Sequence, residues 1–213
     1  YRGYGWSGGQ PGLATLRGDA GALWRALPDV AARHGLDWPP LGPLVILGRS
    51  LGAHCALHVA ALHGDELDLV VLDSPCACHW PFETLPGELW RGLAEQLPGL
   101  CPAERTLGCP CCRDGAAADR LAAWLDPLDL ARCLEPPLLL VHGTADALCP
   151  RSQAAALFEA AAGAKELVWV PGAGHNEVPG RPEFWEALER ALAAPARRRA
   201  ATGGDAAAAA PAT

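Results

Sequence analysis

The sequence predicts an α/β fold, a mostly parallel sheet with helices on both faces. Short apolar segments alternate with longer amphipathic ones, which is the pattern of parallel strands joined by helices. Apart from Asp68, these short segments consist of apolar residues, as strands covered on both faces do. The candidate strands are residues 44–47, 67–72, 138–141 and 167–170.

The composition favours one globular core and excludes some functions. With 213 residues, of which 50% are hydrophobic and 19% charged, the chain has enough apolar material for one domain. Its formal charge is −7 and its 17 Lys and Arg residues are scattered, so it has no basic face for nucleic acid. No apolar run reaches bilayer length and no secretory signal is evident.

The segment before the first candidate strand contains a glycine-rich loop and a helix. Glycines recur over residues 3–12, which indicates a tight loop at the end of a strand. A helix follows, because apolar residues recur at steps of three and four. We expect Pro28 to bend or divide this helix and His34-Gly35 to end it. The residues predicted on its apolar face are Leu16, Ala20, Leu23, Trp24, Leu27 and Val30.

A strand, an abrupt turn and a helix surround Ser50. The strand at 44–47 leads into Gly48-Arg49-Ser50-Leu51-Gly52, and an Ala- and Leu-rich helix follows. Glycines two residues on either side of a serine let strand and helix approach closely, so that the hydroxyl stands exposed. We therefore interpret Ser50 as a nucleophile rather than an ordinary turn serine. The other serines, Ser7, Ser74 and Ser152, lack this setting.

The rest of the chain divides into core, insertion and tail. Residues 1–194 are predicted to form the core, with further helices at 152–162 and 182–194. Residues from about 76 to 136 interrupt the alternation with prolines, glycines and cysteines, and we interpret them as an inserted lid. The tail, 195–213, is of low complexity and is predicted to be disordered.

Three loops that follow predicted strands contain complementary chemical groups. In a parallel sheet, catalytic groups gather beyond the carboxyl ends of the strands. Ser50, Asp146 and His175 all lie in such loops. Serine needs a base to accept its proton, and a carboxylate must orient that base, so these residues form a candidate catalytic triad. Asp73 also follows a strand and is the alternative acid.

Four segments together resemble the α/β-hydrolase superfamily. Within it they are similar to the branch of serine hydrolases that act on fatty-acyl esters and protein thioesters, the depalmitoylase-like enzymes. The resemblance runs from residue 1 to about 194, except in the insertion. The matching segments are Tyr-Arg-Gly-Tyr-Gly-Trp-Ser-Gly-Gly-Gln-Pro at 1–11, Gly-Arg-Ser-Leu-Gly at 48–52, His-Gly-Thr-Ala-Asp at 142–146 and Gly-Ala-Gly-His-Asn at 172–176.

The resemblance implies a serine hydrolase that cleaves an ester or thioester, with an apolar acyl group, through an acyl-enzyme. Ser50, His175 and Asp146 would form its triad, and the N–H of Leu51 would be one oxyanion-hole donor. It implies a small-molecule or acylated-protein substrate, no cofactor and no catalytic metal, and it leaves membrane association open. A peptidase of the same fold and a non-catalytic binding domain are the remaining alternatives.

The family has eight strands, and by this comparison the chain begins at the end of the fourth. The sequence contains no methionine, so we expect an N-terminally truncated fragment that lacks the first three strands. The strand at 44–47 would then lie at an uncovered, apolar edge. The second oxyanion donor would also be missing, and loss of one such donor lowers rates by about 10²–10³. We therefore expect weak activity from this piece alone.

The nine cysteines have two interpretations. A long chain with an apolar core and no secretory signal favours mostly reduced thiols in a cytosol-like compartment, and hence a cytoplasmic location. Alternatively, soft ligands at 76–79 and 109–112 could bind one structural zinc ion. His54 and His58 also stand four residues apart on the predicted helix after Ser50, but packing is the favoured role because no third ligand is evident.

Overall fold

The computed structural model describes residues 2–10, 15–76 and 127–193. Within these ranges the chain forms a parallel sheet of four strands in the order β1-β2-β3-β4. The strands are β1 (Val45–Arg49), β2 (Leu69–Asp73), β3 (Leu138–Gly143) and β4 (Lys165–Val170). This architecture confirms the predicted fold class, and each predicted strand is present with ends shifted by one or two residues.

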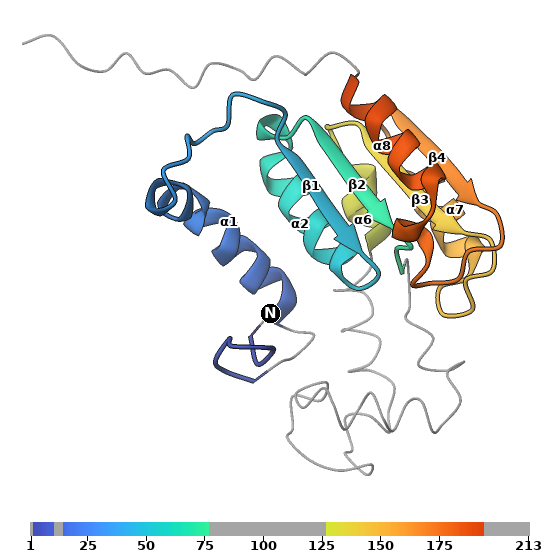
Figure 1. Ribbon diagram of the computed structural model, residues 1–213, viewed down its shortest axis with the longest axis horizontal. Coiled ribbons are helices and arrows are strands. Elements are labelled where there is room, and N and C mark those ends of the chain that lie inside the picture. Colours follow the sequence, from blue (N-terminus) through green and yellow to red (C-terminus); the bar gives the residue numbers. More distant parts are fainter. Residues whose placement is uncertain (1, 11–14, 77–126, 194–213) are drawn as a thin grey trace, which may run out of the picture.

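Helices cover both faces of this sheet (Figure 1). The layer on one face contains α2 (Gly52–His63), α6 (Pro127–Arg132) and α7 (Arg151–Ala160), and α1 (Leu16–Arg33) packs against α2. The other face packs against α8 (Pro182–Ala193). Short 3-10 turns, η2 (Gly64–Glu66) and η3 (Val178–Gly180), complete the described elements. In the described parts of the chain, no helix combines the length and the hydropathy needed to cross a bilayer.

Along the two central strands, successive side chains point alternately into the apolar layers on the two faces of the sheet. Val70 and Leu72 of β2 belong to the core beneath α2 and α7, whereas Leu69 and Val71 belong to the core beneath α8. Every residue of β2 and β3 is buried. Complete burial of a Val or Leu side chain contributes about 1.5–3 kcal/mol, so these strands anchor the loops that follow them.

Strand β1 lies at the edge of the described sheet, as predicted. Among the described residues its only strand partner is β2, and Leu47 is 52% exposed. An apolar edge strand of this kind is a pairing site for another strand.

Helix α1 differs from the prediction in two respects. It continues through Pro28, which lacks the N–H that would bond to the carbonyl of Trp24. Trp24 packs in the same core cluster as Ala53 and Ala56 of α2, so tertiary packing outweighs the lost bond. Leu23 is 64% exposed and lies outside the buried face. The helix does end at His34-Gly35, where Gly35 adopts a φ of 66°.

Helix α6 belongs to the core, although it falls within the predicted insertion. Ala131 and Leu134 are buried in the cluster that α2 and α7 share. Residues 127–136 are therefore part of the packed domain. The predicted lid body, 77–126, and the predicted disordered tail, 195–213, lie outside the described residues.

Gly48, near the end of β1, has no room for a side chain. A Cβ atom there would lie 2.6 Å from the carbonyl oxygen of Gly52, 2.7 Å from Cβ of Ala56 and 2.8 Å from Cα of Ala53. Two of these atoms are backbone and cannot rotate away. Glycine at this position therefore lets α2 start directly beside β1.

Gly48→Ala should lower the free energy of unfolding by about 3 kcal/mol, at the upper end of overpacking costs. Urea denaturation measures this change. Gly18→Ala in α1 is the matched control, because a Cβ there meets nothing within 4 Å. It should raise stability by about 0.5–1 kcal/mol through helix propensity. Wild-type stability in Gly48→Ala would contradict the close approach of strand and helix.

Candidate active site

Ser50 occupies a sharp turn between β1 and α2. Its φ is +50°, in the left-handed region that non-glycine residues adopt at a cost of about 1–2 kcal/mol. Two backbone hydrogen bonds hold the turn: Ser50 N–H donates to the Asp73 carbonyl at 2.9 Å, and Ala53 N–H donates to the Ser50 carbonyl at 3.1 Å. A strained residue held by its surroundings is typical of functional sites.

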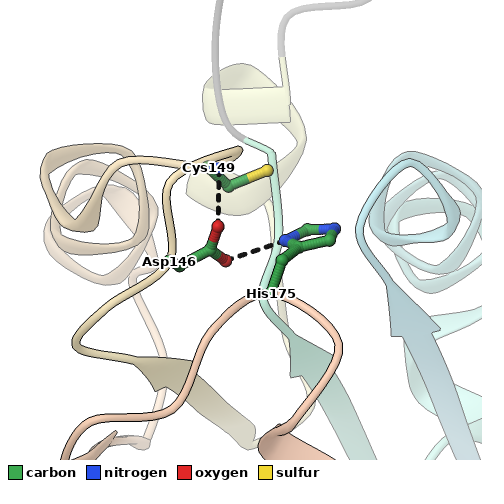
Figure 2. A group of neighbouring side chains, drawn as sticks. All are labelled: Asp146, Cys149 and His175. Atoms are coloured by element: carbon green, nitrogen blue, oxygen red, sulfur yellow. Dashed lines mark hydrogen bonds and ion pairs between the residues drawn. The ribbon is translucent and has the colours of Figure 1, made fainter.

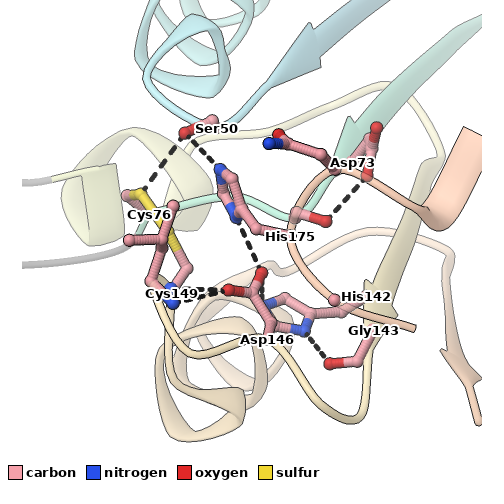
Figure 3. Close-up of polar contacts among 12 residues, drawn as sticks. Ser50, Asp73, Cys76, His142, Gly143, Asp146, Cys149 and His175 are labelled. Atoms are coloured by element: carbon pink, nitrogen blue, oxygen red, sulfur yellow. Dashed lines mark hydrogen bonds and ion pairs between the residues drawn. A yellow bond between two sulfur atoms is a disulfide. The ribbon is translucent and has the colours of Figure 1, made fainter. Parts of the chain in front are cut away.

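Ser50, His175 and Asp146 form a continuous chain of polar contacts at the carboxyl ends of the strands. The Ser50 Oγ lies 2.9 Å from Nε2 of His175, and His175 Nδ1 lies 2.8 Å from Oδ2 of Asp146. Figure 2 shows the contact between Asp146 and His175, and Figure 3 shows the whole chain. The structure thus brings together the three residues that the sequence predicted.

The Asp146 carboxylate is held in one orientation. Its Oδ1 accepts hydrogen bonds from the backbone N–H groups of Leu148 and Cys149, both at 2.9 Å. Its Oδ2 faces His175, and Nε2 of His142 lies 3.7 Å from the same oxygen. The side chain is fully buried. Oδ1 is therefore bound to the loop backbone, and Oδ2 is directed at His175.

The loop after β3 and the loop after β4 are bound to each other. Ala145 N–H donates to the Ala173 carbonyl at 3.0 Å, and Gly172 N–H donates to Oγ1 of Thr144 at 2.8 Å. A Cβ on Gly143 would lie 2.2 Å from the Ala173 oxygen, so glycine is required where the two loops cross. This junction fixes the distance between Asp146 and His175.

Arg49 is a site residue that sequence reasoning missed. Its guanidinium donates to the His175 carbonyl at 2.9 Å and to Oδ1 of Asn176, and its Nε lies 3.1 Å from Oδ2 of Asp73. Arg49 therefore links the turn at Ser50, the end of β2 and the loop that contains His175. The one available signal was Asp73 itself, because a carboxylate that ends a buried strand needs a cation nearby.

Asp73, the alternative acid, has other partners. Its Oδ1 accepts a hydrogen bond from the Ser74 hydroxyl at 2.8 Å, and Oδ2 pairs with Arg49. Burial raises the pKa of Asp73, and the Ser74 hydrogen bond and the Arg49 charge oppose that rise. Asp146, by contrast, makes the contact with Nδ1 of His175.

Leu51, the predicted oxyanion-hole donor, lies at the junction between Ser50 and α2. It directly follows Ser50 and is the residue that precedes the first residue of α2. The N–H groups at a helix start have no acceptor within the helix and attract negative charge. An oxyanion that formed on a carbonyl attacked by Ser50 would lie next to this amide.

A disulfide adjoins Ser50. Cys76, just after β2, is bonded to Cys149 in the loop after β3, and the Cys76 Sγ lies 3.7 Å from the Ser50 Oγ. The prediction of reduced thiols is wrong for this pair, although Cys55 and Cys133 form no disulfide. The two cysteines are 73 residues apart, and only the neighbouring strand ends bring them together. The other ligands of the predicted zinc site lie outside the described residues.

His54 and His58, the pair four residues apart, both lie in α2. His54 is buried in α2, and burial lowers the pKa of His58, helped by the charges of Arg17 and His63. In the part of the chain that the structure describes, neither belongs to a group of potential metal ligands. His142 places Nδ1 2.9 Å from the Gly143 carbonyl.

Curated proteins of similar sequence align with most of this chain. No protein-family model matches the chain. It is 29% identical over 193 residues to alpha/beta hydrolase domain-containing protein 17B of Xenopus laevis, covering 91% of this chain and 54% of that protein. It is 27% identical over 190 residues to human alpha/beta hydrolase domain-containing protein 17C, covering 89% and 46%. The chain thus spans about half the length of these curated relatives.

Solved structures share the fold. A monoacylglycerol lipase of Paleococcus ferrophilus superposes with a TM-score of 0.59 and 22% identity, over 90% of this chain and 79% of the lipase. An acetyl xylan esterase of Paenibacillus sp. R4 superposes with a TM-score of 0.57 and 24% identity, over 79% of this chain and 49% of the esterase. The parallel sheet, the strained serine turn and these similarities agree, and the chain therefore has an α/β-hydrolase fold.

Proposed function

We propose that the protein is a serine hydrolase that cleaves carboxylic esters or thioesters through an acyl-enzyme. The observation that carries the proposal is the contact chain from Ser50 through His175 to Asp146, with separations of 2.9 and 2.8 Å. A hydroxyl, an imidazole and a buried carboxylate at these distances can activate the serine for attack on a carbonyl.

In the proposed reaction, the Ser50 Oγ attacks the substrate carbonyl carbon while Nε2 of His175 accepts the hydroxyl proton. The Leu51 N–H donates to the oxyanion of the tetrahedral intermediate. His175 then returns the proton to the departing alcohol or thiol, which leaves an acyl group on Ser50. Water releases the acyl group by the same steps, again with His175 as base. Such general acid–base catalysis contributes about 10²–10⁴ in rate.

Asp146 supports both halves of this cycle. Because Oδ2 accepts from Nδ1 of His175, the neutral ring keeps its lone pair on Nε2, facing Ser50. The carboxylate also stabilises the imidazolium that forms after proton transfer. Arg49, bonded to the His175 carbonyl, is proposed to hold the ring at this distance.

For the substrate, we propose an apolar acyl group on a small molecule or on an acylated protein. The support is the resemblance of the segments at 1–11, 48–52, 142–146 and 172–176 to hydrolases of fatty-acyl esters and protein thioesters. A peptidase remains the second candidate, because an acylaminoacyl peptidase of Pyrococcus horikoshii shares the fold with a TM-score of 0.56 and 14% identity.

The substrate class can be tested with a panel of p-nitrophenyl esters and matched acyl thioesters of increasing chain length, alongside aminoacyl p-nitroanilides. We expect kcat/KM to rise from acetyl to longer acyl chains and the anilides to react at background rate. Preference for an aminoacyl anilide would support the peptidase instead. Background rates on every substrate, together with no labelling by a fluorophosphonate, would favour the non-catalytic binding domain.

A further inference from the structure

Two residues of the proposed triad also belong to a cluster that combines a sulfur, a nitrogen and an oxygen ligand. One ligand atom each of Asp146, Cys149 and His175 lies within 4.8 Å of the others. Figure 2 shows the three side chains gathered around one point, with the sulfur of Cys149 directed toward the ring of His175. Thiolate, imidazole and carboxylate are the ligands that Zn²⁺ takes in tetrahedral sites.

A fourth ligand is available at the same place. The Cys76 Sγ is bonded to the Sγ of Cys149, so it lies one bond away from the group that Cys149 forms with Asp146 and His175. Cys76 is 3% exposed, Cys149 1% and the His175 side chain 11%, so the described residues shield most of the cluster. From these observations we propose that, when the disulfide is reduced, Cys76, Cys149, His175 and Asp146 bind a zinc ion that inhibits the enzyme.

Reduction is needed because a disulfide sulfur is a poor zinc ligand and the thiolate is a good one. A dithiol reductant breaks the S–S bond by supplying two electrons and two protons, and it becomes a disulfide itself. Zinc then displaces one proton from each of the two thiols, and both protons pass to the solvent. The metal–sulfur and metal–nitrogen bonds are about 2.3 and 2.0 Å, so the two sulfurs must move apart after their bond is broken to reach a tetrahedral arrangement.

Zinc at this position would block the proposed chemistry directly. A zinc ion bound to a ring nitrogen of His175 and to Asp146 would occupy the groups on which Ser50 depends. The histidine lone pair could no longer accept the serine proton, or the carboxylate could no longer orient the ring. The disulfide, in contrast, leaves both contacts in place. The oxidised protein is therefore the active form and the reduced, zinc-bound protein the inactive one. This consequence for activity rests on the proposed function, whereas zinc binding does not.

The test measures zinc binding by competition with a chromophoric chelator, on oxidised protein and on protein reduced with a phosphine. Reduced wild type should bind zinc at least 100-fold more tightly than reduced Cys149→Ala. Cys133→Ala, which removes an exposed thiol away from the cluster, should bind as wild type does. Comparing these two variants distinguishes zinc binding at the cluster from zinc binding by cysteines outside the described residues, because both variants keep those cysteines.

Cys76→Ala provides a second variant, because it frees the Cys149 thiol without a reductant and leaves three ligands. It should bind zinc equally well with and without the phosphine. Zinc should also slow fluorophosphonate labelling in reduced wild type at least 10-fold more than in reduced Cys149→Ala. Equal zinc affinity in reduced wild type and folded Cys149→Ala, checked by circular dichroism, would overturn the proposal. Zinc binding without any hydrolase activity would leave the site in place and count against the proposed function alone.

Discussion

Ser50→Ala should lower kcat for ester hydrolysis by about 10⁵–10⁶ and abolish labelling by a fluorophosphonate probe. In a serine hydrolase, removal of the nucleophile costs about as much as removal of the whole triad, because the histidine and the carboxylate act only through it. In this protein the Ser50 Oγ is the atom that Nε2 of His175 contacts, at 2.9 Å. Steady-state hydrolysis of a p-nitrophenyl ester and gel-based labelling measure the two effects.

The control for this prediction is Ser152→Ala, which removes an exposed hydroxyl in α7. It should hydrolyse and label as wild type does. Ser50 has a positive φ, so the alanine variant must also be checked for stability by thermal unfolding. Undiminished labelling of folded Ser50→Ala would mean that another residue reacts with the probe and that Ser50 is not the nucleophile.

Asp146→Asn should lower kcat by about 10⁴ with little change in KM. The backbone N–H groups of Leu148 and Cys149 donate to the oxygen at the Oδ1 position, so the amide oxygen of the asparagine should occupy that position. Its NH2 group would then face His175 and donate to Nδ1. The ring would keep its proton on Nε2, the nitrogen that must accept the proton of Ser50. Michaelis–Menten kinetics on the ester measure the loss.

Asp73→Asn is the matched variant, because it makes the same chemical change in a buried carboxylate one strand away. It should keep kcat within about 10-fold of wild type, since Asp73 bonds to Ser74 and pairs with Arg49 and not with the His175 ring. Its main effect should be on stability, because breaking a pair with a buried charge costs up to about 3–5 kcal/mol. A larger loss of kcat in Asp73→Asn than in Asp146→Asn would reverse the assignment of the acid.

Local patterns in the sequence were enough to predict the strands and the turn around Ser50. The strands are apolar runs bounded by Pro and Gly, and burial on both faces requires that composition whatever the rest of the fold does. The residue two positions before Ser50 is glycine because a Cβ there would lie 2.6 Å from a backbone oxygen. Close packing of this kind leaves a signature in single residues, which can be recognised without coordinates.

Some local patterns were misleading because tertiary packing overrode them. Pro28 is a strong helix breaker, yet α1 continues through it because Trp24 is buried against α2. The sequence pattern grouped Cys76 with cysteines near it in the chain, but its bonded partner is Cys149. In both cases the deciding contact was with a segment distant in the sequence.

By itself, the sequence determined a parallel α/β fold, a serine in a strained turn, and a carboxylate and an imidazole after later strands. Those features depend on the composition and spacing of neighbouring residues. Only the tertiary structure decided that Asp146 rather than Asp73 faces His175, that Arg49 bonds to the histidine loop, and that Cys76 meets Cys149 beside Ser50. The physical reason is that the order and register of the parallel strands bring their loops together, and no local pattern encodes which loops meet.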